Sequence, residues 1–133
     1  MAHALSPGYR KLVEDAQQRV PSFTIDEFLA RLQAGERYIL IDVREESEWA
    51  RGHLPGAHHL GRGTLEREIE QALPDKHAPI ALYCDGDHRS TLAADSLQRL
   101  GYTVVVALEG GWSAWRERGL PVVSPVVSSP FVP

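Results

Sequence analysis

A short apolar run, Ile80–Tyr83, leads directly into Cys84, the only cysteine of the 133-residue chain. A polar loop follows, and from Ser90 to Leu100 the apolar residues recur at helical spacing. This order predicts a buried strand, a tight loop and a helix, with the thiol at the end of the strand. The first N–H groups of a helix favour negative charge, and the thiolate is the reactive form of cysteine. The sequence therefore predicts an α/β protein with a reactive cysteine at this junction.

Further apolar runs and helical patterns alternate along the chain. Strands are expected at 38–43 and 104–108, with a brief edge strand at 57–60. Helices are expected at 9–20, 24–35, 45–50, 64–73 and 112–118. The second of these begins with a capping-box pattern, Thr24 to Glu27. Strands that alternate with helices indicate a mainly parallel sheet, and such sheets bind ligands at the carboxyl ends of their strands.

Composition narrows the classes of partner. The net charge of −4 and the lack of a Lys/Arg cluster argue against a nucleic-acid partner. No run approaches the roughly 20 apolar residues that span a bilayer, and residues 1–10 lack a signal-peptide core. A single cysteine cannot form an internal disulfide, which favours a reducing compartment. We therefore expect a cytoplasmic protein with no membrane and no nucleic-acid partner.

Four stretches of the chain carry familiar motifs in a fixed order. Ile41-Asp42-Val43-Arg44 is followed by Glu48-Trp49, and residues 52–57 read Gly-His-Leu-Pro-Gly-Ala. Residues 83–90 hold the cysteine loop, and residues 108–122 contain Leu-Glu-Gly-Gly-Trp and Gly-Leu-Pro-Val. Over about 24–122 the chain resembles the rhodanese family, specifically its small single-domain bacterial members.

The resemblance implies a fold and a division of the chain. The fold is a three-layer α/β domain, a five-stranded mainly parallel sheet with helices on both faces. The expected parts are an N-terminal helical extension (1–23), a rhodanese-like domain (24–123) and a tail rich in Pro, Ser and Val (124–133).

The resemblance also implies a chemistry. Cys84 matches the residue that takes a sulfane sulfur from a donor, holds it as a persulfide and passes it to a thiophilic acceptor. Asp85, Gly86, Asp87, His88 and Arg89 match the loop whose backbone amides surround the sulfur. No cofactor or metal is implied. The expected partners are small sulfur-containing anions or protein persulfides.

Two acidic residues set this loop apart, because commoner members have neutral or basic residues at Asp85 and Asp87. A carboxylate roughly 7 Å from a thiolate costs about 0.6 to 2.4 kcal/mol at an effective dielectric of 80 to 20. Arg89 and a protonated His88 act in the opposite direction. We therefore expect weak use of the thiosulfate dianion, and polysulfide, a low-molecular-weight persulfide or a protein persulfide as the donor.

Several polar residues are assigned supporting roles. Ser90 is expected to cap the helix after the loop. Asp42 is expected to hold turn backbone, and Arg44 to pair with Glu48 or a neighbour. Arg89, at a helix start, needs a compensating partner or an anionic substrate.

The histidines suggest structure rather than metal chemistry. His53 is expected to bond backbone in its turn. His58 and His59 are neighbours in a strand, so they point to opposite faces and are poorly placed to share an ion.

Alternative functions remain open at this point. The domain could be a sulfur carrier or protein-binding module with little turnover on thiosulfate, and Cys84 could be a buried structural thiol. A phosphatase or arsenate reductase is disfavoured, because those relatives use a loop one residue longer than the six residues from Cys84 to Arg89. A regulatory domain that has lost catalysis usually lacks the cysteine.

Overall fold

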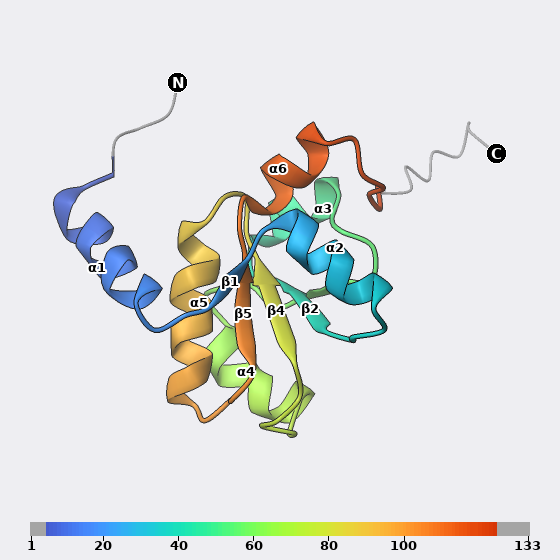
Figure 1. Cartoon of the computed structure of the whole chain (residues 1–133). Helices are drawn as coiled ribbons and strands as arrows, with labels where there is room; N and C mark the ends of the chain where they lie inside the picture. The colour runs from blue at the N-terminus through green and yellow to red at the C-terminus, as the bar shows by residue number, and fades with distance from the viewer. Residues whose placement is uncertain (1–4, 125–133) are drawn as a thin grey trace, which may run out of the picture.

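The structure, a computed structural model in which residues 5–124 are described, contains one five-stranded sheet. Every pairing between neighbouring strands is parallel, and the order across the sheet is β1-β5-β4-β2-β3 (Figure 1). The strands are β1 (Ser22–Phe23), β2 (Ile39–Asp42), β3 (His58–His59), β4 (Ile80–Tyr83) and β5 (Val105–Leu108). The predicted α/β class with a parallel sheet is confirmed, and β3 is the predicted edge strand.

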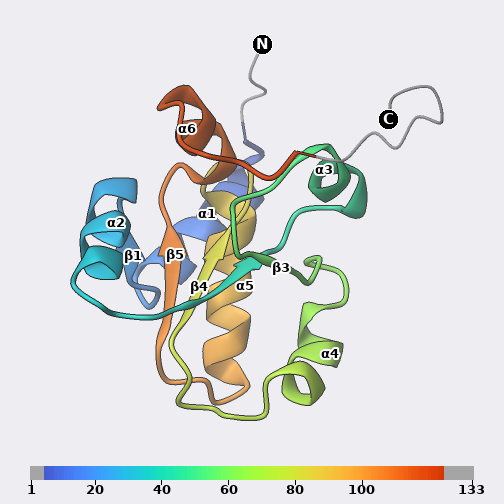
Figure 2. The same ribbon diagram turned by 90° about the vertical axis from the view of Figure 1, so that its right-hand side faces the viewer.

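Six helices surround this sheet in the described part of the chain. They are α1 (Pro7–Gln17), α2 (Ile25–Gln33), α3 (Glu46–Arg51), α4 (Leu65–Ala72), α5 (His88–Arg99) and α6 (Gly111–Glu117). Helices α4 and α5 cover one face of the sheet, and α2 and α6 cover the other, as Figures 1 and 2 show together. Helix α1 packs on the outside of α5. Helices α3 and α6 lie at the carboxyl end of the strands (Figure 1).

The central strand β4 is buried on both faces. Ile80, Leu82 and Cys84 belong to the core beneath α4 and α5. Ala81 and Tyr83 alternate with them and belong to the core beneath α2 and α6. This placement explains why the run is wholly apolar instead of alternating with polar residues.

Helix α5 begins earlier than the sequence indicated, and the prediction that Ser90 caps it is wrong. The helix starts at His88, and the N-cap is Asp87, whose side chain makes no capping hydrogen bond. Ser90 therefore lies in the first turn. Its hydroxyl and that of Thr91 donate back to the carbonyl of Asp87, at 3.3 and 2.7 Å.

The N-terminal segment also departs from its predicted pattern. Helix α1 ends at Gln17, so Val20 follows it in the chain, although Val20 is buried in the core. Leu12, an apolar residue within the predicted helix 9–20, is 55% exposed. The strand β1 was not predicted, because two residues carry no periodic signal. Arg19 pairs with Asp95 of α5 at 2.8 Å and fixes the end of this segment.

The division at residues 23 and 123 stays a prediction, and residues 125–133 of the predicted tail lie outside the described residues. Across residues 5–124, none of the helices combines the length and the apolar character needed to cross a membrane.

Candidate active site

The loop after β4 is bonded to the start of α6. The carbonyl of Cys84 accepts a hydrogen bond from the backbone N–H of Trp112 at 2.9 Å. The carbonyl of Asp85 accepts from the backbone N–H of Ser113 at 3.0 Å. Two of the otherwise unsatisfied N–H groups at the start of α6 are thus used to hold the loop.

This close approach requires a glycine at position 111. The backbone of Gly111 has a φ of +49°, and a Cβ built there would overlap the carbonyl oxygen of Cys84 and lie 2.8 Å from that of Gly86. A side chain at this position would therefore push α6 away from the loop.

The thiol of Cys84 lies at the floor of the loop. The residue is only 1% exposed, and Sγ is 3.4 Å from the hydroxyl oxygen of Ser90. The sulfur is thus placed between the end of β4 and the first turn of α5, where the sequence predicted it.

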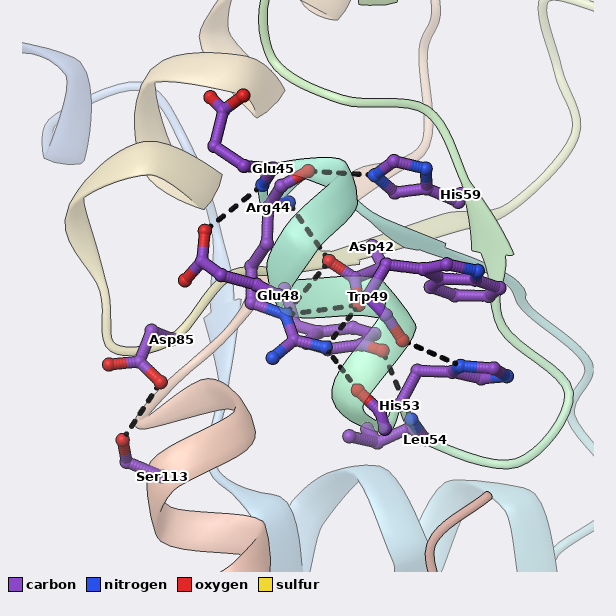
Figure 3. Close-up of polar contacts among 12 residues, drawn as sticks. Asp42, Arg44, Glu45, Glu48, Trp49, His53, Leu54, His59, Asp85 and Ser113 are labelled. Carbon is purple, nitrogen blue, oxygen red and sulfur yellow. Dashed lines mark hydrogen bonds and ion pairs between the residues drawn. The ribbon is translucent and has the colours of Figure 1, made fainter. Parts of the chain in front are cut away.

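The two acidic side chains of the loop are turned toward α6. Asp85 Oδ1 accepts from the Ser113 hydroxyl at 3.2 Å (Figure 3), and Asp87 Oδ1 accepts from the backbone N–H of Gly110 at 2.7 Å. Both aspartates remain exposed. Their charges therefore lie at the entrance to the loop.

The guanidinium of Arg89 has a partner that the sequence did not identify. It donates to Glu48 of α3 through two bonds, of 2.7 and 3.0 Å. These bonds lower the pKa of Glu48 to about 2 and raise the pKa of Arg89. The expected compensation of a cation at a helix start is confirmed, and its source is a residue from another helix.

Asp42, the last residue of β2, forms a buried ion pair with Arg44. Arg44 Nη2 lies 2.8 Å from Asp42 Oδ2 and donates to the carbonyl of Gly52 at 2.7 Å. Burial alone would lower the pKa of Arg44, but the bond to Asp42 raises it overall. Asp42 also accepts from the backbone N–H of Arg44 at 2.9 Å, as predicted for a residue that holds turn backbone. Arg44 therefore pairs with its neighbour Asp42, while Glu48 serves Arg89.

Trp49 of α3 lies between two histidine rings, an arrangement that the sequence did not predict (Figure 3). The ring of His53 stacks on it at 3.5 Å between centroids, and the ring of His59 lies at 5.1 Å. His59 Nε2 also lies 2.7 Å from the carbonyl oxygen of Arg44. The backbone contact expected of His53 is a long one, 3.5 Å from Nδ1 to the carbonyl of Trp49.

Two further residues complete the surroundings of the loop. The ring of Tyr9 in α1 meets His88 edge-on, with centroids 6.0 Å apart. The aromatic ring of Trp112 lies 4.6 Å from the Arg44 guanidinium. Among residues 5–124, no group of three or more His, Cys, Asp or Glu side chains is arranged to hold a metal ion.

The family described as "Rhodanese-like domain" matches residues 24–118.

Similar curated proteins include enzymes, carriers and uncharacterised chains. The uncharacterised protein YqhL of Bacillus subtilis is 36% identical over 100 residues, covering 74% of this chain and 75% of its own. A sulfurtransferase of Allochromatium vinosum is 34% identical over 95 residues, covering 71% and 87%. A putative sulfur carrier protein of Bacillus subtilis, YrkF, is 25% identical over 115 residues, covering 86% of this chain but 60% of its own.

The similar solved structures also include sulfur transferases and a protein of unknown function. A Rhodopseudomonas palustris protein of unknown function, described as a possible tyrosine phosphatase, has a TM-score of 0.79 at 27% identity, covering 92% of this chain and 99% of its own. The polysulfide-sulfur transferase homodimer of Wolinella succinogenes has a TM-score of 0.74 at 26% identity, covering 91% and 90%. A thiosulfate sulfurtransferase of Pseudomonas aeruginosa has a TM-score of 0.70 at 36% identity, covering 80% of this chain but 20% of its own.

Proposed function

The chain belongs to the rhodanese-like domain family, and from this premise we propose that it is a sulfurtransferase that carries sulfane sulfur on Cys84. One observation carries the proposal. The only cysteine of the chain follows the central strand β4 and faces the first turn of α5, which begins at His88. A sulfur anion at this place lies against the end of a helix that favours negative charge.

The proposed reaction proceeds in two displacements. The Cys84 thiolate attacks the outer sulfur of the donor, a new S–S bond forms, and the donor's remainder leaves with the electron pair of the broken bond (sulfite in the case of thiosulfate). A thiophilic acceptor such as cyanide or a thiolate then attacks the terminal sulfur of the persulfide. The S–S bond to Cys84 breaks, and the thiolate is regenerated.

Loop length supports sulfur transfer over phosphate chemistry. One similar structure, from Rhodopseudomonas palustris, is described as a possible tyrosine phosphatase. The segment from Cys84 to Arg89, with both ends counted, is six residues long. The phosphatases and arsenate reductases of this fold use a loop one residue longer, which suits a tetrahedral oxyanion. Hydrolysis of an aryl phosphate by the purified protein would instead favour the phosphatase.

A mass measurement tests the proposal. The purified protein is incubated with polysulfide, and separately with thiosulfate, and its intact mass is recorded. We expect the addition of one sulfur atom, and none after Cys84 has first been blocked by alkylation. Turnover of cyanide to thiocyanate then separates an enzyme from a carrier such as the one suggested by YrkF. Failure of every sulfane donor to load the protein would overturn the proposal.

The acidic entrance of the loop gives a prediction about the donor. Replacing Asp85 or Asp87 by Asn keeps an oxygen acceptor for α6 but removes a negative charge from the entrance. Each change is expected to lower the thiosulfate KM by about two- to tenfold, since a like charge at roughly 7 Å repels a dianion. Steady-state kinetics with thiosulfate measure this.

The control is Asp75→Asn. Like the loop aspartates, Asp75 accepts a hydrogen bond, from the backbone N–H of His77 to its Oδ1 at 2.9 Å. Because Asp75 precedes β4, it lies at the opposite end of that strand from Cys84. If Asp85→Asn and Asp87→Asn had the same thiosulfate KM as the control variant, the electrostatic interpretation would be contradicted.

A further inference from the structure

The strongest unassigned feature near the loop is the carboxylate of Glu48. We propose that Glu48 determines donor specificity by holding Arg89 in an ion pair, so that anionic sulfur donors, thiosulfate and polysulfide alike, are disfavoured at Cys84 relative to uncharged donors. This inference rests on the proposed sulfur transfer and adds a residue from a different helix to it.

The ion pair neutralises the cation of the loop. Both oxygens of Glu48 accept from Arg89, and Glu48 keeps its charge because its pKa lies at about 2. Arg89 lies in the first turn of α5, the turn whose Ser90 hydroxyl oxygen is 3.4 Å from Cys84 Sγ, so the guanidinium belongs to the element that adjoins the thiol. Asp85 and Asp87 are exposed on the same loop, so that three carboxylates and one guanidinium belong to this region. An anionic donor therefore meets net negative charge.

Helix α3 fixes Glu48 in this position. Glu48 Oε1 also accepts from the backbone N–H of Glu45 at 3.0 Å, as part of a capping box at the start of the helix (Figure 3). The next residue, Trp49, is stacked between His53 and His59. An incoming anion thus competes for the Arg89 guanidinium with a carboxylate whose position is fixed by a hydrogen bond within its own helix.

The pair is nevertheless open to a ligand. The side chain of Arg89 is 31% exposed and that of Glu48 is 27% exposed. Within residues 5–124, the hydrogen bonds of the Arg89 guanidinium are the two to Glu48, which leaves its remaining N–H groups facing solvent or a ligand. Removing the Glu48 charge would free a cation beside the thiol without rebuilding the loop.

The substitution Glu48→Gln makes this test specific. Glutamine keeps the length of the side chain and the oxygen that completes the capping box, while it removes the charge and one of the two oxygens that accept from Arg89. The control is Glu36→Gln, which removes a carboxylate from another pair with an arginine, Arg31 at 3.2 Å, in the segment that precedes β2 at the far end of the sheet.

The readout uses three methanethiosulfonate reagents of similar size that carry a negative, a positive or no charge. In each case the Cys84 thiolate attacks the sulfenyl sulfur, a disulfide forms and methanesulfinate leaves. Because the chain has one cysteine, each rate reports on Cys84 alone. The ratio of charged to neutral rates cancels any change in how often the loop opens.

We expect Glu48→Gln to raise the rate ratio of the anionic to the neutral reagent by about five- to tenfold and to lower the rate ratio of the cationic to the neutral reagent. For Glu36→Gln, both ratios should equal those of the wild type. Equal changes for all three reagents, or no change, would overturn the role of Glu48 and leave the sulfurtransferase proposal standing. A thiol that no reagent modifies in any of these proteins would overturn both.

Discussion

A protein with Cys84 replaced by serine is expected to lose sulfur transfer and to keep its fold. A hydroxyl cannot form a persulfide, so turnover should fall at least about a thousandfold for any sulfane donor. Stability should change by only about 1 kcal/mol, because the serine hydroxyl keeps a hydrogen-bonding partner in Ser90, next to the start of α5. Cyanide-dependent thiocyanate formation measures the first effect, and urea unfolding measures the second.

The two measurements have to be made on the same preparation. Retained turnover within tenfold of the wild type would show that another group accepts the sulfur. A large loss of stability would show instead that the thiol is chiefly a packing residue, the alternative interpretation of a buried cysteine.

In contrast to the Cys84 variant, replacing Asp42 by alanine is expected to destabilise the fold, with a loss of about 3 to 5 kcal/mol in the free energy of unfolding. The change leaves the guanidinium of Arg44, which is 2% exposed, without its carboxylate partner in the interior. The bond from Arg44 to the carbonyl of Gly52 is not enough to compensate a buried charge. Urea unfolding followed by tryptophan fluorescence gives the free energy.

A surface pair of the same chemistry provides the control for this change. Asp26 lies 2.7 Å from Arg118, but its side chain is 80% exposed. Asp26→Ala should therefore cost less than about 1 kcal/mol. If Asp42→Ala cost no more than Asp26→Ala, the buried pair would not be the stabilising feature that its geometry indicates.

Much of the fold could be predicted because local patterns and tertiary burial agree. The apolar runs at β2, β4 and β5 are all buried between two helical layers, and the capping box at Thr24 forms as its spacing indicated. The start of α5 was placed too late, because the polar loop residues His88 and Arg89 look like loop although they are already helical. Helix α1 was extended too far, since Val20 is buried by the sheet core and not by a helical face.

The candidate site was predicted less completely than the fold. The sequence placed Cys84 correctly at the end of β4, because a strand–loop–helix order is a local pattern. The partner of Arg89 could not be found in this way. Glu48 is 41 positions away in the sequence, and the contact depends on how α3 sits against the start of α5. The stacking of His59 on Trp49 likewise depends on the pairing of β3 with β2.

The alternation of side chains along β4 has a consequence for how the strand can vary. Cys84 shares the layer of Ile80 and Leu82, whereas Tyr83 faces the opposite layer and its hydroxyl oxygen accepts from the backbone N–H of Leu54 at 3.0 Å. Deleting or inserting one residue within β4 would exchange these two layers and turn the thiol away from α5, even with every residue of the loop preserved. Insertions or deletions in β4 that keep the Cys84 thiol facing α5 should therefore contain an even number of residues.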